Sequence, residues 1–447
     1  MTAENKRRKF FLKALPAFIR RRIEHREGVQ KVAANIGWLF FDKFLRMGMG
    51  LFIGAWVARY LGPEKYGMFN YAFAYVALFG SFATFGLEKL VIRELVSRPA
   101  DQDTILGSTF FVRLLGAGAA AVLATVSIGY VRANNHIIFI LVILSSTGLI
   151  VQAFKTLDLY FQSQVQSKYT VIAYNSAFLV SSLVKVILIL NKADLFAFAG
   201  VALGEIILGT FILILFYHFK ANAHIVNWKP SMFQATSFIR ESWPLILANI
   251  SSMLNMRIDQ IFIGKMLNDA AVGNYSVAVK ISEIWLMIPM MLGGSIYPKI
   301  IEAKKKSHSL YIYRLHKIFF FMCCFTLPVA LLVSFNSEFI IGLIFGNRYS
   351  DAGTILSIHI WSGVPYMVTF AYGQMFYIEK LIKLTFFTSL FTPVCNIGLN
   401  MYLIPRYGAV GAAVATMVTS FGVCMISLSL LYVNVKKKNR KNGTVDG

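Results

Sequence analysis

The chain has 447 residues, of which 57% are hydrophobic and only 15% are charged, and its mean hydropathy is +0.62. A soluble domain is nearer half apolar and a quarter charged, so this composition excludes an ordinary water-soluble protein. The net charge of +23 would suit nucleic-acid binding, but its placement in tails and loops, described below, indicates a membrane protein with no nucleic-acid partner.

Apolar blocks of about 20 residues, long enough to cross a hydrocarbon core of about 30 Å, follow one another along the chain. We predict twelve spans: 32–58, 67–88, 106–130, 136–154, 169–190, 195–219, 242–264, 273–297, 316–335, 353–376, 384–404 and 408–434. They leave no room for a sizeable soluble domain, so the predicted fold class is an all-α polytopic membrane protein. The run at 339–346 is too short to cross alone, and we interpret it as an extension of the ninth helix or an interfacial piece.

The Lys and Arg residues are distributed asymmetrically over the predicted loops. Thirty-one of the 44 lie in the two tails and the even-numbered loops or at their edges, whereas the odd-numbered loops hold seven. Because short cytoplasmic loops carry an excess of Lys and Arg, both termini are predicted to be cytoplasmic. The basic segment at 6–27 is compatible with an interfacial helix on anionic lipid and equally with a simple topogenic tail.

An internal repeat organises the twelve spans. YLGPEKYGMFNYA (60–72) aligns without gaps with MLNDAAVGNYSVA (266–278), so that Gly67 falls on Gly273 and Ala72 on Ala278. LVKVILIL (183–190) resembles GLNMYLIP (398–405) at a similar offset. We therefore predict two parallel six-helix repeats around a central cavity, as in many transporters. The predicted domains are a cytoplasmic tail (1–31), an N-lobe (32–219), a cytoplasmic linker (220–241), a C-lobe (242–434) and a second basic tail (435–447).

Charged residues inside the predicted spans are the candidate site. A charge near the bilayer centre costs about 2.5–3.5 kcal/mol or more and therefore usually faces protein or water. The candidate substrate-binding cations are Lys43, Arg46, Lys185, Arg257 and Lys280. The candidate charge partners, or ion-coupling groups, are Asp42, Glu205, Asp259 and Glu283. Asp42, Lys43 and Arg46 share about one helix face, because their spacings are i, i+3 and i, i+4.

Two interpretations of these charges remain open. They can line a water-filled cationic cavity that attracts an anion such as a phosphate, which guanidinium binds in bidentate fashion. Alternatively, they can be local ion pairs that hold helices together, as Lys280 could with Glu283. Arg113 and Asp42 lie nearest the cytoplasmic ends of their spans and could snorkel. His359 is more often a satisfied interior histidine than a proton relay.

Motifs of soluble enzymes are absent from the sequence. It contains no GxxxxGK[ST], HExxH or GxSxG motif and no His/Cys set at metal-ligand spacing. We therefore expect a transporter without metal or other cofactor, and no ATP hydrolysis within this chain. The energy for transport would come from an ion gradient, the membrane potential or the substrate gradient.

Three stretches in order along the chain resemble one known family. They are ARYLGPEKYGMFNYA (58–72), SWPLILANISSMLNMRIDQIFIGKMLNDAAVGNYSVA (242–278) and NIGLNMYLIPRYGAVGAAVAT (396–416). The chain resembles the polysaccharide flippases, of the O-antigen or capsule type, in the multidrug/oligosaccharidyl-lipid/polysaccharide exporter superfamily. The resemblance covers nearly the whole chain.

The resemblance implies translocation of an undecaprenyl-diphosphate-linked oligosaccharide to the outer leaflet of the bacterial inner membrane, for surface polysaccharide such as lipopolysaccharide. It implies two six-helix lobes in a V, with Lys43, Arg46 and Arg257 lining the cavity and Asp259 in the matching motif. Membrane lipids, a coupled H⁺ or Na⁺ and the polysaccharide polymerase machinery are the further partners that the resemblance leads us to expect.

Two other functions compete with this interpretation. A drug or organic-cation antiporter of the same superfamily would favour an acidic cavity, whereas the embedded charges here are six basic and four acidic. A membrane polysaccharide polymerase or ligase typically carries a large external loop, and the longest predicted external connection is only about 336–352. Both features favour the flippase.

Overall fold

The computed structural model describes residues 27–221, 223–284, 299–379 and 381–443. Within these ranges the chain forms α-helices joined by short 3-10 segments and turns, with no strand. The all-α prediction is confirmed. The segment at 6–27, predicted as an interfacial helix or a basic tail, lies almost wholly outside the described residues.

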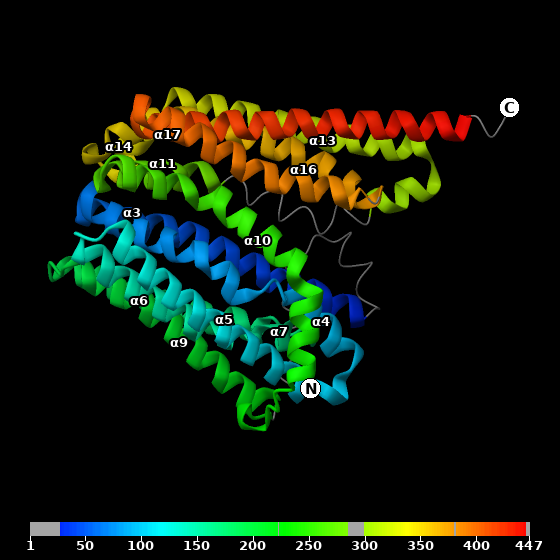
Figure 1. Ribbon diagram of the computed structural model, residues 1–447, viewed down its shortest axis with the longest axis horizontal. Coiled ribbons are helices and arrows are strands. Elements are labelled where there is room, and N and C mark those ends of the chain that lie inside the picture. The colour runs from blue at the N-terminus through cyan, green and yellow to red at the C-terminus, as the bar shows by residue number, and fades with distance from the viewer. Residues whose placement is uncertain (1–26, 222, 285–298, 380, 444–447) are drawn as a thin grey trace. The chain divides into compact units, whose positions relative to one another are not determined.

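The helices follow one another with short connections (Figure 1). In chain order they are α3 (Glu27–Thr84), α4 (Glu88–Ser97), α5 (Gln102–Val131), α6 (His136–Gln152), α7 (Thr156–Ser163), α8 (Lys168–Leu190), α9 (Leu195–Ala221), α10 (Met232–Met266), α11 (Asp269–Glu283), α13 (His308–Phe335), α14 (Ser337–Phe345), α15 (Asp351–His359), α16 (Gly363–Ile378) and α17 (Ile382–Gly443).

Among the described residues, eight helices or runs of helices are long and apolar enough to cross a membrane. Two of these runs, Gly37–Ser97 and Phe387–Leu431, hold 61 and 45 residues, enough for two crossings each at about 1.5 Å per residue. Each bends at a glycine with positive φ, Gly62 (73°) in α3 and Gly408 (61°) in α17, where a β-carbon would be strained. The eight runs, two of which are long enough to cross twice, account for a fold of about twelve spans together with α10 and the described part of α11.

Three details differ from the sequence prediction. The run at 339–346 lies in a separate helix, α14, that begins after Asn336 and packs against α15, so it is not an extension of α13. The predicted cytoplasmic connections contain the short helices α4 and α7. The last helix continues to Gly443 and thus through most of the predicted C-terminal tail.

The described chain forms two compact units. Unit 1 comprises the described residues of Met1–Ile53, Phe82–Val122 and Leu144–Leu245, and unit 2 those of Gly54–Ser81, Leu123–Ile143 and Ile246–Gly447. The two-lobe division at 32–219 and 242–434, with its parallel repeats, remains a prediction.

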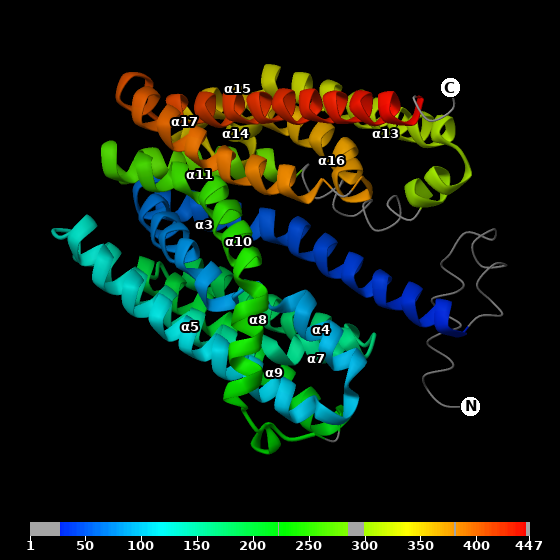
Figure 2. The same ribbon diagram turned by 45° about the vertical axis from the view of Figure 1, so that its right-hand side comes forward.

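Unit 1 is built around a buried apolar cluster contributed by α4, α5, α7, α8, α9, the connection before α10 and the start of α10. Its largest members are Phe161, Tyr217, Trp228 and Phe238. α8 and α9 form an antiparallel hairpin in this unit (Figure 2). The hairpin and α3 position the first group of candidate site residues.

In unit 2, α13, α16 and α17 run side by side (Figures 1 and 2). A buried cluster around Tyr311, Leu315, Met375 and Phe376 holds α13 to α16. α15 packs against α11 and α17, and these three helices, with α10, position the second group of candidate site residues.

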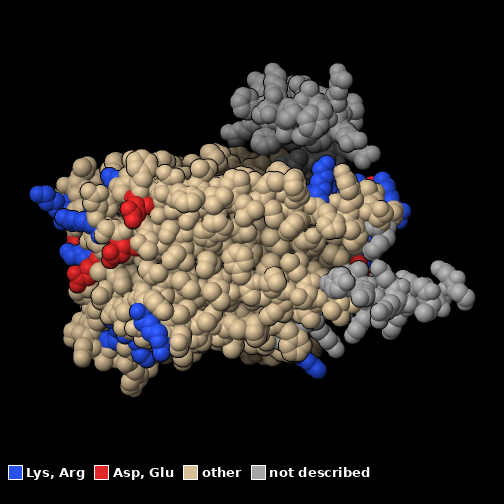
Figure 3. All heavy atoms as spheres, turned by 90° about the horizontal axis from the view of Figure 1, so that it is seen from above, with Lys and Arg blue, Asp and Glu red and all other residues tan. Residues whose placement is uncertain are grey.

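The surface over α13 and α17 is apolar across its middle, and charged side chains gather at its two ends (Figure 3). Large exposed side chains of these two helices include Phe320, Leu332 and Phe335 on α13 and Met425 on α17. Such a contiguous apolar band is typical of a surface that faces lipid. The chain is therefore a multi-pass membrane protein.

Candidate ion and substrate sites in two units

Four of the predicted site residues meet in unit 1, on α3, α8 and α9. On α3, the Arg46 Nε donates to Asp42 Oδ1 at 2.9 Å across one helical turn. The Arg46 Nη1 also lies 3.8 Å from Glu205 Oε1 on α9, and its guanidinium lies 5.4 Å from the centre of the Phe178 ring on α8. Arg46 is thus shared between its own helix and the α8–α9 hairpin.

Glu205 is the centre of this group. Its Oε2 accepts a hydrogen bond of 2.5 Å from Ser181 Oγ and one of 3.2 Å from Lys185 Nζ, both on α8. The group has two positive and two negative charges, all partly buried, on Asp42, Arg46, Lys185 and Glu205. Pairing reduces the cost of placing these charges in a membrane-spanning region.

Two other predicted cations of unit 1 lie elsewhere. Lys43 is exposed and makes no ion pair with a described residue. Arg113 on α5 is only 3% exposed. The suggestion that Arg113 snorkels to the surface is therefore wrong, because the side chain is almost completely buried; Glu88, Asp158 and Tyr174 are near enough to interact with it electrostatically.

In unit 2, Arg257 on α10 and Glu283 on α11 are partly buried and interact electrostatically. The Lys280 Nζ lies directly over the Cα of Gly54, in the space that a β-carbon there would occupy. None of the ion pairs between described residues joins Lys280 to Glu283, the local pair that the sequence suggested. Lys280 instead extends across to α3.

Asp259 on α10 lies in a separate, fully buried polar cluster and is only 5% exposed. Its Oδ1 accepts from Asn400 Nδ2 at 2.6 Å, and its Oδ2 accepts from Tyr275 Oη at 2.5 Å and from Thr416 Oγ1 at 2.6 Å. The Asn400 Nδ2 also donates to Asn396 Oδ1 at 2.8 Å. A carboxylate that accepts several hydrogen bonds can stay inside a protein despite the cost of desolvation.

Asp259 is recognisable in the sequence as a charge inside a predicted span, whereas its partners on α11 and α17 are not among the predicted site residues. Asn396 and Asn400 stand at i, i+4 within an otherwise apolar span, so they occupy one face of that helix. Two amides on one face of a membrane helix are a feature that could have identified them. Tyr275 and Thr416 carry no comparable feature in the sequence.

His359 on α15 is buried and its Nδ1 lies 2.8 Å from Ser282 Oγ, with its ring edge-on to Tyr275. The expectation of a satisfied interior histidine agrees with this geometry. Within the described ranges no three His, Cys, Asp or Glu residues come together as a metal site.

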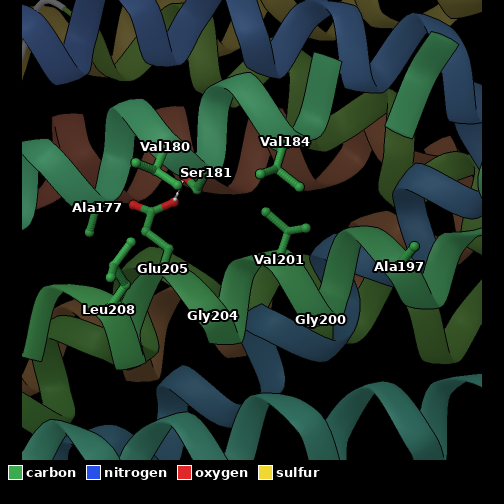
Figure 4. A pocket seen from close by; sticks show the side chains of 10 residues that line it. All are labelled: Ala177, Val180, Ser181, Val184, Ala197, Gly200, Val201, Gly204, Glu205 and Leu208. Atoms are coloured by element: carbon green, nitrogen blue, oxygen red, sulfur yellow. Dashed lines mark hydrogen bonds between the residues drawn. The ribbon is translucent and has the colours of Figure 1, made fainter. Parts of the chain in front are cut away.

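A groove of about 400 Å³ opens between α8 and α9 of unit 1 (Figure 4). Its walls are mostly small or aliphatic, and Ser181 and Glu205 supply its polar part. In Figure 4 the Glu205 carboxylate points toward Ser181. The groove is therefore mostly apolar, and its lining residue Glu205 belongs to the charged group that contains Arg46 and Lys185.

Each of these sites is chemically suited to charge recognition rather than to bond making. Unit 1 holds two cations whose carboxylate partners could be replaced by an anionic ligand, and unit 2 holds a buried carboxylate surrounded by neutral donors. Such sites can bind an anion and a small cation, respectively.

The family model described as polysaccharide biosynthesis protein matches residues 32–304, which is more than half of the chain. A second family model, MatE, matches residues 244–402. The matched regions include both the Arg46 and Glu205 group and Asp259.

Two curated relatives are similar in sequence. A Haloferax volcanii protein described as the low-salt glycan biosynthesis flippase Agl15 is 25% identical over 196 residues, or 44% of this chain and 41% of that protein. A Shigella flexneri protein described as an O-antigen transporter is 24% identical over 384 residues, or 80% of this chain and 88% of that protein. The chain thus spans less than half the length of the first relative and most of the second. Both are named as transporters rather than enzymes.

Two solved structures share the fold. An inward-facing multidrug resistance MATE transporter of the MOP superfamily superposes with a TM-score of 0.73 at 13% identity, covering 89% of this chain and 96% of that one. The lipid II flippase MurJ superposes with a TM-score of 0.69 at 15% identity, covering 89% and 87%. The chain belongs to the polysaccharide biosynthesis protein family, whose model matches more than half of it, and it has the fold of these two transporters.

Proposed function

We propose that this protein is a flippase that moves an undecaprenyl-diphosphate-linked oligosaccharide from the cytoplasmic to the outer leaflet, for surface polysaccharide assembly. The observation that carries the proposal is the group formed by Arg46, Lys185 and Glu205 within membrane-spanning helices of a polysaccharide-family chain. Paired charges inside membrane-spanning helices are costly and are typically kept for binding or transport.

A diphosphate is the ligand that best suits Arg46 and Lys185. The guanidinium offers two parallel N–H donors to phosphate oxygens, and the ammonium adds a mobile point charge. In the structure these cations contact Glu205, at 3.8 Å and 3.2 Å respectively. The diphosphate would take the place of that carboxylate, while Glu205 keeps its hydrogen bond from Ser181. Lys43, Arg257 and Lys280 are the further cations that we assign to the substrate path.

Transport would proceed by alternating access. The two six-helix lobes, 32–219 and 242–434, would rock about the linker at 220–241, so that the sugars cross through water while the lipid chain stays in the bilayer. We place the protein in the bacterial inner membrane with both termini in the cytoplasm. The polysaccharide polymerase machinery would receive the product on the outer side.

Asp259 is the group that we assign to ion coupling. Its carboxylate is buried among hydroxyl and amide groups, an environment that can exchange a proton or hold Na⁺. Asp42, Glu205 and Glu283 are the other carboxylates that could titrate during the cycle. A gradient of H⁺ or Na⁺ would then drive the return of the unloaded carrier.

The test replaces Arg46 or Arg257 by Ala and measures surface polysaccharide in cells that depend on this protein. A hydrogen bond to a charged group is worth about 1.5–3 kcal/mol, so substrate affinity should fall roughly tenfold to a hundredfold. We expect polymer output to fall in both variants while membrane insertion is unchanged. Arg46→Lys should retain part of the output because it keeps the charge.

Arg406→Ala is the matched control, because Arg406 is exposed and both its hydrogen bond and its ring contact are made with Tyr402, one turn earlier in the same helix. Its polymer output should equal that of the wild type. Normal output from both Arg46→Ala and Arg257→Ala at equal protein levels would refute the roles assigned to these residues.

A multidrug antiporter is the second candidate, and the MatE match over residues 244–402 favours it. A cationic drug would require a net negative site, whereas the embedded residues are six basic and four acidic. Efflux of a cationic dye that depends on this protein, in cells with unaltered surface polysaccharide, would support the antiporter over the flippase.

A further inference from the structure

The α8–α9 groove has an unusual origin. Small residues in membrane helices normally allow two helices to touch. Here a β-carbon on Gly200 or Gly204 of α9 would meet no other atom within 4 Å. The two helices therefore leave space at these glycines, and that space is the groove of about 400 Å³ (Figure 4).

The lining of the groove is apolar along most of its length. It comprises Ala177, Val180, Val184, Ala197, Gly200, Val201, Gly204 and Leu208, in addition to Ser181 and Glu205. Val180 is also among the exposed apolar residues, so the groove is open to the surroundings of the hairpin. A lipid-like chain could enter from the side without crossing a polar barrier.

The polar part of the groove indicates which kind of lipid fits it. Glu205 lines the groove and contacts Lys185 Nζ at 3.2 Å and Arg46 Nη1 at 3.8 Å. An occupant that places an anionic group at these cations and an apolar chain along the valines and glycines would satisfy both parts at once. An amphiphile with phosphate directly attached to a hydrocarbon chain has this arrangement, because no glycerol separates the charge from the chain.

We propose that the α8–α9 groove binds the first isoprene units of the polyprenyl chain of the lipid-linked substrate, with the diphosphate at Arg46 and Lys185. The proposal rests on the proposed function and adds a second recognition element, the lipid itself. A volume of about 400 Å³ corresponds to about 13 groups of the size of water at ~30 Å³ each. That is enough for roughly two to three five-carbon units, and the rest of the chain would extend into the bilayer.

Substitution of the two glycines fills the groove with little disturbance of the fold. Because Gly200 and Gly204 face open space, the variant Gly200→Leu/Gly204→Leu should fold and fill the groove with its own side chains. Gly118→Leu is the matched control, since a β-carbon on Gly118 of α5 would also meet no atom within 4 Å and this glycine lies outside the groove.

The experiment uses the full chain in nanodiscs and a prenyl diphosphate with a diazirine on the isoprene unit nearest the diphosphate. After illumination, mass spectrometry maps the labelled residues. We expect labels on the groove residues Val180, Val184, Val201 and Leu208, reduced about tenfold in Gly200→Leu/Gly204→Leu, equivalent to about 1.4 kcal/mol, and unchanged in Gly118→Leu. Unlabelled prenyl diphosphate should compete, and phosphatidylglycerol should not.

Labels outside the groove, or competition by phosphatidylglycerol as strong as that by prenyl diphosphate, would overturn the groove assignment. Transport of a lipid-linked oligosaccharide in proteoliposomes is measured in parallel to separate the two proposals. If Arg46→Ala blocks transport but no groove residue is labelled, the groove assignment is wrong and the proposed flippase function stands. No transport by the wild type removes the proposed function itself.

Discussion

Asp259 illustrates, at the scale of a single residue, how a carboxylate is held inside a membrane-spanning helix. Hydroxyl groups of Tyr275 and Thr416 and the amide of Asn400 all donate to it. These donors compensate the loss of water, because a buried polar group without a partner costs about 1–3 kcal/mol. The sequence showed the charge, but only the folded chain showed that neutral donors rather than Arg257 satisfy it.

Two substitutions separate the effect of the charge of Asp259 on stability from the effect of its packing. Asp259→Asn keeps the shape, and the hydroxyls of Tyr275 and Thr416 can turn to accept from the new amide, so thermal stability should stay close to that of the wild type. Asp259→Ala leaves those partners unpaired and should lower the unfolding free energy by about 1–3 kcal/mol or more. Thermal melting of the purified proteins in detergent measures both effects.

Transport should respond differently from stability. If Asp259 couples transport to an ion gradient, Asp259→Asn should abolish the dependence of transport on that gradient in proteoliposomes. A gradient dependence that survives in Asp259→Asn would contradict the coupling role while leaving the structural role intact.

Close approach of helix backbones is the main feature at the scale of elements. In unit 2 a β-carbon on Gly67 of α3 would overlap the carbonyl oxygen of Asp269, and one on Gly273 of α11 would overlap that of Pro63. These two glycines are the residues that the internal repeat aligns with each other. Their lack of a side chain is what allows α3 and the start of α11 to touch along their backbones.

Gly67→Ala and Gly273→Ala should both be strongly destabilising, because the overlapping atoms belong to backbone and cannot rotate away. Overpacking of this kind costs about 1–3 kcal/mol, and more where the backbone must move. Melting temperatures in detergent should fall clearly in both variants. Gly118→Ala should leave the melting temperature unchanged, since it faces open space; an equal fall there would show that the loss at Gly67 is not caused by the helix contact.

The connection between α9 and α10 is a second element that the structure defines. Trp228 is buried and its indole Nε1 donates to Tyr217 Oη at 3.1 Å. The Ser231 amide donates to Ser108 Oγ at 2.9 Å, and Gly107 leaves room for the backbone at Lys229 and Pro230. The described part of the predicted linker is therefore packed onto α5 and α9 rather than free.

Trp228→Ala should release this connection. Removal of a buried Trp side chain costs about 3–5 kcal/mol, most of which should appear as local opening. Limited proteolysis should cut the variant rapidly near residues 223–231, whereas the wild type resists. Trp228→Phe keeps most of the packing and should be cut slowly; equal cutting of wild type and Trp228→Ala would contradict a docked linker.

Orientation in the membrane is a property of the whole molecule. α9 has 27 residues, about 40 Å at 1.5 Å per residue, so its two ends should lie on opposite sides of the bilayer. The distribution of basic residues predicts that Lys192, before α9, lies outside and that Lys220, at its end, lies in the cytoplasm.

Cysteine labelling tests this orientation. Cys323, Cys324, Cys395 and Cys424 are first replaced by Ala, and Lys192→Cys or Lys220→Cys is then introduced. In intact cells an impermeant maleimide should label Lys192→Cys, whereas Lys220→Cys should require permeabilisation. The reverse pattern would place the termini outside and invalidate the assigned direction of transport.

The sequence alone determined the class of the protein and the number of spans. Length and apolarity of each block, and the count of Lys and Arg in each loop, are local properties that lipid and water act upon directly. The pair Asp42 and Arg46 could also be anticipated, because its members are one turn apart on one helix. The family resemblance rested likewise on contiguous stretches.

Only the tertiary structure decided which distant residues meet. The contacts between distant residues depend on how each helix is rotated about its own axis. They are the contact of Glu205 with Arg46, the contacts of Asn400 and Thr416 with Asp259, the position of Lys280 over Gly54 and the burial of Arg113. In a membrane that rotation is weakly encoded by composition, since lipid-facing and protein-facing sides can be equally apolar. Close packing at a few glycines and the pairing of a few polar groups settle it, and these are contacts between residues far apart in the chain.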